Sequence, residues 1–186
     1  MNDLVAYYRA MARNNAWSNH RLLSACKALT QAEFDAQRVS FFPSLTETLN
    51  HILFVDQFYI DALEGRARPF NEDKPCRTVA ELATAQSASD RRLVAFCDAL
   101  SASALTRPVE LIRDDGVLGD STERVLAHLF VHQIHHRGQA HAMLAGTTVA
   151  PPQLDEFLLA TDAPLRTKDL AALGMGEAEV WPEPQT

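Results

Sequence analysis

The sequence predicts an all-α protein, a four-helix bundle of up-down-up-down topology with a short extra helical segment near the C-terminus. Four long stretches carry apolar residues at helical spacing, and moderate connections join them, as in helix bundles. The 186 residues include only 7 Gly and 9 Pro, few breakers for an all-β protein with many tight turns. We expect one bundle domain over residues 1–162 and a loosely structured C-terminal extension over 163–186.

The ends of the helices are marked by local signals. The helices are expected at about residues 3–29, 44–63, 78–100 and 121–144. Ser44 and Glu47 fit a capping box that opens the second helix, and Thr78 and Glu81 fit one that opens the third. The fourth stretch is followed by Gly146, a common helix stop.

The connections carry turn residues. Residues 30–33 fit a further capping box that restarts a short turn. Residues 106–120 predict a short hairpin or an irregular loop. Residues 154–160 are expected to supply the short extra helical segment, and the helical pattern weakens beyond Pro164.

Charge and cysteine usage exclude several classes of protein. The net charge of -7 and the pI of about 5.4 argue against a general surface for nucleic acids or anionic membranes. No apolar run approaches the length of a transmembrane helix, and the first residues do not resemble a signal peptide. Cys26, Cys76 and Cys97 show no CxxC spacing and are interpreted as reduced thiols. We therefore expect a soluble, cytoplasmic protein that binds neither nucleic acid nor a membrane.

Histidines are concentrated on the fourth predicted helix. Five of the seven lie between residues 128 and 141. On a helical wheel, His132 and His136 fall on the shoulder of the apolar arc, one turn apart, whereas His128 and His135 fall further toward solvent. His141 falls inside the arc, which suggests a packed or interface residue.

Two imidazoles at positions i and i+4 can share one metal ion. The alternative for His132 and His136 is a histidine-rich helix edge without a metal. His51, at the shoulder of the second helix, is the best candidate for a third ligand, although a lone histidine there can also be a partly buried, hydrogen-bonded residue. His20 is expected to face solvent.

Three segments resemble the DinB-like family of bacterial damage-inducible proteins. They are residues 15–23 on the first helix, 49–56 on the second and 128–141 on the fourth, and the resemblance covers about residues 4–160. Val131 stands where relatives often carry Asn. The tail after Pro164 lies outside the resemblance.

The resemblance implies a four-helix bundle, a metal triad of His51, His132 and His136, and a homodimer. It also implies one of two activities: some relatives are transferases or isomerases that use a low-molecular-weight thiol, and others are described as metal-dependent hydrolases. Three neutral imidazoles leave coordination positions open, as catalytic sites do. Such ligands favour Zn or Ni, with Fe, Mn or Co as alternatives.

We therefore expect a metal-dependent enzyme that transfers a low-molecular-weight thiol to an electrophilic small molecule. A metal-dependent hydrolase and a non-enzymatic, stress-induced module that binds metal or a small molecule are the alternatives. Glu47 and Gln139, one turn from the ligands, are candidates to orient them, and the alternative is that both are solvated polar groups on their helices. Trp17 and Asn19 belong to the resemblance without an assigned role.

Two further expectations concern helix packing. The apolar arc of the fourth helix spans roughly 180°, wider than the stripe of about 100° that one core contact needs, so a second subunit or a wider core can cover it. Asp56 and Arg137 both fall inside apolar arcs. If the second and fourth helices run parallel, as in an up-down-up-down bundle, these two charges are level and should form an ion pair. The alternative is that Arg137 contacts the partner subunit or a backbone carbonyl.

Overall fold

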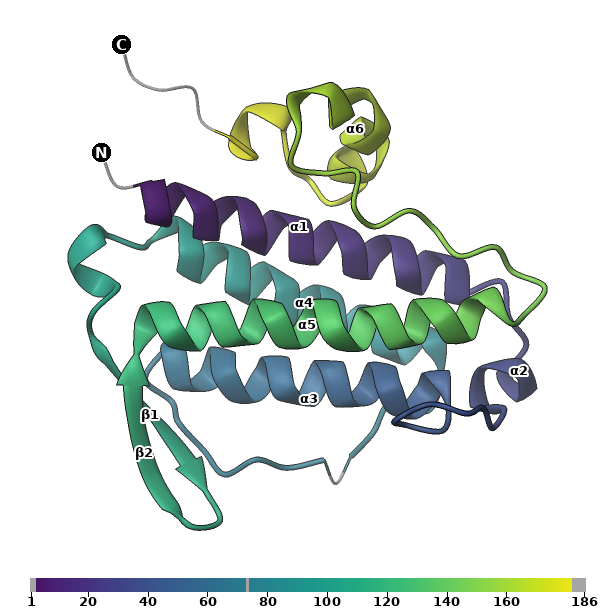
Figure 1. Ribbon diagram of the computed structural model, residues 1–186, viewed down its shortest axis with the longest axis horizontal. Helices are drawn as coiled ribbons and strands as arrows, with labels where there is room; N and C mark the ends of the chain where they lie inside the picture. The colour runs from purple at the N-terminus through teal and green to yellow at the C-terminus, as the bar shows by residue number, and fades with distance from the viewer. Residues whose placement is uncertain (1–2, 73, 182–186) are drawn as a thin grey trace.

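Four long helices form the bundle in the computed structural model, which describes residues 3–72 and 74–181 (Figure 1). Their bounds are Asp3–Cys26 for α1, Leu45–Leu63 for α3, Val79–Asp98 for α4 and Thr122–Ala145 for α5. Each lies within a few residues of its predicted span. The predicted helical bundle is confirmed. No helix among the described residues is long and apolar enough to cross a membrane.

The direction of α4 differs from the prediction. Asn50, in the first half of α3, bonds the carbonyl of Cys76 just before α4, and Glu64, at the end of α3, accepts from Arg92 near the end of α4. The two helices therefore run parallel, and the topology is up-down-down-up. Residues 64–72 and 74–78, the described parts of the connection, run back along the bundle to make this possible (Figure 1). An extended segment of that length reaches roughly 50 Å, whereas α3 is about 28 Å long.

Around the bundle, α1 is next to α4, α4 to α3, and α3 to α5, while a smaller contact between α1 and α5 closes the ring. The α3/α5 interface and the α1/α4 interface thus lie on opposite sides. Two apolar clusters fill the two ends of the core. Between them lies a buried polar layer, which we define by its residues Asn15, Asn19, Asp56, Gln86, Asp90, Gln133 and Arg137.

Shorter elements connect the helices. The capping box of Thr30 and Glu33 opens α2 (Gln31–Asp35), as the sequence predicts. The segment before α5 holds the 3-10 turn η1 (Ala102–Ala104) and then a hairpin of β1 (Pro108–Arg113) and β2 (Gly116–Ser121), in which Leu111 pairs with Leu118. The hairpin was one of the two alternatives for this loop.

Residues 163–181 of the C-terminal extension are more ordered than the sequence indicates, and residues 182–186 lie outside the described part of the chain. The turn η2 (Ala160–Asp162) leads into α6 (Ala163–Ala172), and a further turn, η3 (Glu177–Glu179), follows. The structure therefore holds a helix where a loosely structured extension was expected, and this segment lies along the outside of α1 (Figure 1). Trp17 is fully buried there against Phe157, Leu170 and Val180. The expected helical turns at residues 154–160 are not formed as an α-helix.

Candidate metal centre

The structure brings together the three histidines that the sequence singled out. His51 projects from α3, and His132 and His136 project from α5, one turn apart. One ligand atom of each lies within 4.8 Å of the other two. The ring centroids are 5.0 Å apart for His51 and His132, 4.7 Å for His51 and His136, and 4.4 Å for His132 and His136. The antiparallel packing of α3 on α5 thus gathers three imidazoles at one point.

The geometry and the protonation of these rings fit a transition-metal ion. The Nε2 atoms of His51 and His132 are 3.1 Å apart, and two nitrogen ligands of one tetrahedral Zn ion lie about 3.3 Å apart. Burial lowers the pKa of His132 to about 3, with the neighbouring imidazoles adding to the effect. Burial also lowers the pKa of His136. Both rings are therefore neutral at pH 7, the form that binds metals.

Two outer side chains orient the rings. Glu72 Oε1 lies 2.8 Å from Nδ1 of His51, and Gln139 Oε1 lies 2.8 Å from Nδ1 of His136. An acceptor at Nδ1 holds the proton there and leaves Nε2 with a free lone pair, as in most metal-binding histidines. Gln139 thus makes the contact with His136 that the sequence predicts.

Glu47 does not take the role expected of it at His51. The Glu47 carboxylate lies at the N-terminus of α3, where Ser44 Oγ donates to it over 3.3 Å. Glu72, from the 64–78 connection, takes that role instead. Sequence periodicity gives no signal for such a residue, because it comes from an irregular segment that returns to the bundle only through its tertiary path.

The remaining histidines lie outside the cluster. His128 and His135 are exposed, as predicted, and His141 contacts the carbonyl oxygen of Pro152 through Nε2. His20 is half-buried rather than fully in solvent. Its side chain lies on α1, across the bundle from the cluster of His51, His132 and His136.

Aromatic rings and a pocket border the histidines. The Phe42 ring lies 4.4 Å from His51 and 5.6 Å from His136, centroid to centroid. Beside them, a pocket of about 450 Å³ has His51, Phe42, Cys76 and Arg77 in its walls. This volume lies in the range of small-molecule sites. Phe42 and Arg77 belong to loops and were not identified from the sequence.

The buried polar layer includes Gln133 and Arg137, which directly follow His132 and His136 on α5. The hydrogen-bond partners of its two charged residues Asp56 and Arg137 differ from the prediction. Asp56 and Arg137 form no direct ion pair. Arg137 Nη1 instead donates to the side-chain oxygens of Asn15, Asn19 and Gln133, while Asp56 accepts from Gln86. The reason is the topology: α3 and α5 are antiparallel, so residues after His51 are level with the part of α5 before His136. Both charges still belong to the one polar layer.

The family model described as the DinB family matches residues 1–169. The chain is 23% identical over 158 residues to Protein DinB of Bacillus subtilis (strain 168), a match that covers 79% of this chain and 91% of that protein.

The fold is also similar to that of a DinB-like protein from Bacillus cereus ATCC 10987, known from a crystal structure. The TM-score is 0.59 at 14% sequence identity, and the match covers 74% of this chain and 90% of the other. At that identity the likeness concerns the fold alone.

Proposed function

The chain belongs to the DinB family, and on that premise we propose that it is a metal-dependent enzyme that transfers a low-molecular-weight thiol to an electrophilic small molecule. His51, His132 and His136 would hold one ion, Zn or Ni before Fe, Mn or Co. The observation that carries the proposal is the approach of the Nε2 atoms of His51 and His132 to 3.1 Å in a cluster of three imidazoles. When bound, the ion would act as a Lewis acid that stabilises a thiolate.

The protein's own groups support a thiol from outside the chain. Cys76 lines the pocket beside His51, but burial raises the pKa of its thiol, so at neutral pH it is a weak nucleophile. Cys26 and Cys97 are buried in the core. The pocket of about 450 Å³ has room for a small thiol and an electrophile, and the rings of Phe42 and Phe54 supply apolar walls.

The test is a transfer assay with purified protein and each of several cellular thiols. The acceptor is 1-chloro-2,4-dinitrobenzene, in which the thiolate sulfur forms a bond to the ring carbon, chloride leaves, and the thiol proton passes to solvent. We expect turnover in the wild type, loss of turnover in His132→Ala, and wild-type rates in the matched control His128→Ala.

Turnover that is unchanged in His132→Ala would contradict the proposal. Hydrolysis of an activated ester such as p-nitrophenyl acetate, lost in the same variant and without any thiol transfer, would favour the hydrolase instead. Metal and ligand binding without turnover of either substrate would favour a binding module.

We also propose that the protein is a homodimer that works in the reducing cytoplasm. The apolar side chains of Val131 and Ile134 on α5 are 66% and 54% exposed, which a second subunit would cover. The three free cysteines suit a reducing compartment. Sedimentation equilibrium should give twice the chain mass of 20.6 kDa at micromolar concentration, whereas Ile134→Asp should give a single chain. A wild-type mass of one chain would overturn the dimer.

A further inference from the structure

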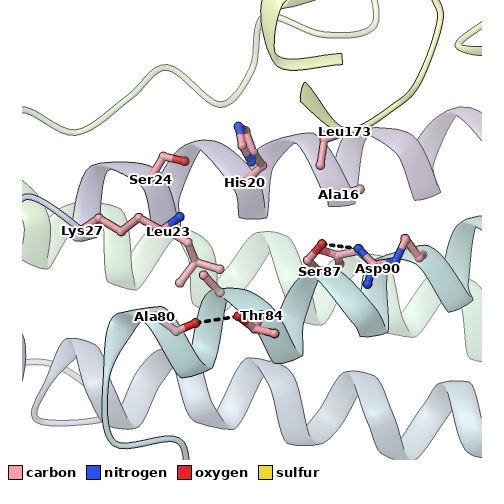
Figure 2. A pocket seen from close by; sticks show the side chains of 12 residues that line it. Ala16, His20, Leu23, Ser24, Lys27, Ala80, Thr84, Ser87, Asp90 and Leu173 are labelled. Carbon is pink, nitrogen blue, oxygen red and sulfur yellow. Dashed lines mark hydrogen bonds between the residues drawn. The ribbon is translucent and has the colours of Figure 1, made fainter. Parts of the chain in front are cut away.

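A second hollow lies between α1 and α4, on the side of the bundle opposite the histidines (Figure 2). Its volume is about 440 Å³, within the range of small-molecule sites. We call it the α1/α4 groove and define it by Ala16 and Leu23 of α1, Lys27 just after α1, and Ala83, Ser87 and Arg91 of α4.

The groove exists because small side chains face each other across the two helices. Ala16 on one side and Ala83 and Ser87 on the other do not fill the space that larger residues would fill. Figure 2 shows Leu173, which follows α6, over the same face of α1. The hollow is thus built from three segments of the fold.

The groove carries a positive charge toward each end. Lys27 and Ser87 lie at opposite ends in Figure 2, and Ser87 accepts a hydrogen bond of 2.7 Å from Arg91 Nη1. Asn19 of α1 is level with Asp90, because its amide donates to that carboxylate over 2.9 Å. Lys27 lies eight residues further on, just past the end of α1, so the charges of Lys27 and Arg91 are about 12 Å apart along the bundle.

Lys27 and Arg91 form no ion pair in the described part of the chain, although the charge of Arg91 acts on the neighbouring Asp90 and opposes the rise in the pKa of that carboxyl. The ion pairs found there do not include Lys27 or Arg91, although the chain has 24 acidic and 17 basic residues. Other arginines of the same two helices are paired, such as Arg13 with Asp98 and Arg92 with Asp61. Lys27 and Arg91 are both exposed.

The acidic side chain in the wall is Asp90, which is only 5% exposed. Its Oδ1 accepts from the amides of Asn15, Asn19 and Gln86 inside the polar layer. This carboxylate oxygen is therefore held by the core, and neither Lys27 nor Arg91 forms an ion pair with Asp90, so both cations can still bind a ligand.

We propose that the α1/α4 groove binds an elongated small molecule with an anionic group, carboxylate or phosphate, at each end. Lys27 binds one end as a compact ammonium, and Arg91 binds the other with its planar fork. The body of the ligand lies over Ala16, Leu23 and Ala83, within reach of the hydroxyls of Ser24 and Ser87. This site is separate from the metal centre and does not depend on it.

The test is a titration of the full-length, isotope-labelled protein, followed by backbone NMR. The probes are octanedioate, with a carboxylate at each end, octanoate, with one, and hexane-1,6-diol bisphosphate. We expect changes in the backbone chemical shifts of residues along α1 and α4. At least one dianion should bind about 10-fold more tightly than octanoate, a difference in binding free energy of about 1.4 kcal/mol. The better dianion shows whether carboxylate or phosphate is preferred.

Variants locate the binding. Lys27→Gln and Arg91→Gln should each lower the affinity for the dianion to that for octanoate, and so remove the advantage of the dianion. Arg124→Gln, which removes a charge from an exposed arginine of α5, should keep it, and so should His132→Ala. The proposal is overturned if neither dianion binds better than octanoate, if the Lys27 and Arg91 variants bind as the wild type does, or if the affinity is lost in His132→Ala.

Discussion

Asp56 should make the protein less stable as the pH rises from 5 to 8. Its side chain is 1% exposed, and one oxygen accepts from Gln86 over 2.7 Å. Burial, together with repulsion from Asp90, raises the pKa of Asp56 from 3.8 to about 7, although Gln133, Gln86 and Arg137 oppose the shift. Between about pH 4 and pH 7, the Asp56 carboxyl therefore keeps its proton in the folded state and has lost it in the unfolded chain.

The sign and the size follow from proton linkage. Where the folded state binds more protons than the unfolded state, the free energy of unfolding falls with rising pH. For a carboxyl that titrates near 7 when folded and near 3.8 when unfolded, the cost grows by about 2–3 kcal/mol between pH 5 and pH 8. Asp56→Asn keeps the shape of the side chain and removes this titration.

Urea unfolding of the wild type and of Asp56→Asn at pH 5 and pH 8, at one ionic strength, measures the effect. The difference between the two proteins cancels other groups, including His132, whose lowered pKa acts in the opposite direction. Relative to the wild type, the variant should gain about 2–3 kcal/mol on going from pH 5 to pH 8. Asp115→Asn, in the exposed hairpin turn, should gain nothing. The reasoning would be refuted if the free energies of unfolding of the wild type and of Asp56→Asn changed by the same amount between pH 5 and pH 8.

Two further predictions concern the site and the extension. Glu72→Gln should weaken metal binding about 10-fold in competition with a chromophoric chelator, because Glu72 orients His51, and Glu47→Gln should not; equal effects of the two variants would contradict the assignment. Leu170→Ala should cost about 2–5 kcal/mol in urea unfolding followed by tryptophan fluorescence, because Leu170 is 1% exposed against Trp17. Leu165→Ala, on the same helix but 49% exposed, should cost less than about 1 kcal/mol. An equally small loss for Leu170→Ala would show that the extension is not part of the core.

The helices and the histidine cluster could be predicted because their signals are local. Capping boxes at Thr30 and Thr78 fixed helix starts within a residue, and the i, i+4 spacing of His132 and His136 follows from helix geometry alone. The wheel also separated the exposed His128 and His135 from this pair. Each inference needs only residues within one or two turns.

The direction of α4 could not be predicted in the same way, because residues 64–78 are long enough either to turn tightly or to cross the bundle. Loop closure costs little more for a long connection than for a short one. Because this connection crosses the bundle, the predicted ion pair between Asp56 and Arg137 is wrong. For the same reason, the role of Glu72 beside His51 was not predicted. The C-terminal extension was misjudged for a related reason: Trp17, against which it packs, is distant in sequence.

Metal content per chain, measured by mass spectrometry on purified wild type and single-histidine variants, tests the central claim most directly. The account predicts one transition-metal ion per chain in the wild type and in the exposed-residue controls His128→Ala and His135→Ala. It predicts no bound ion in His51→Ala, His132→Ala or His136→Ala, with circular dichroism confirming that each variant is folded. A folded His132→Ala protein that retains one ion per chain would contradict the account.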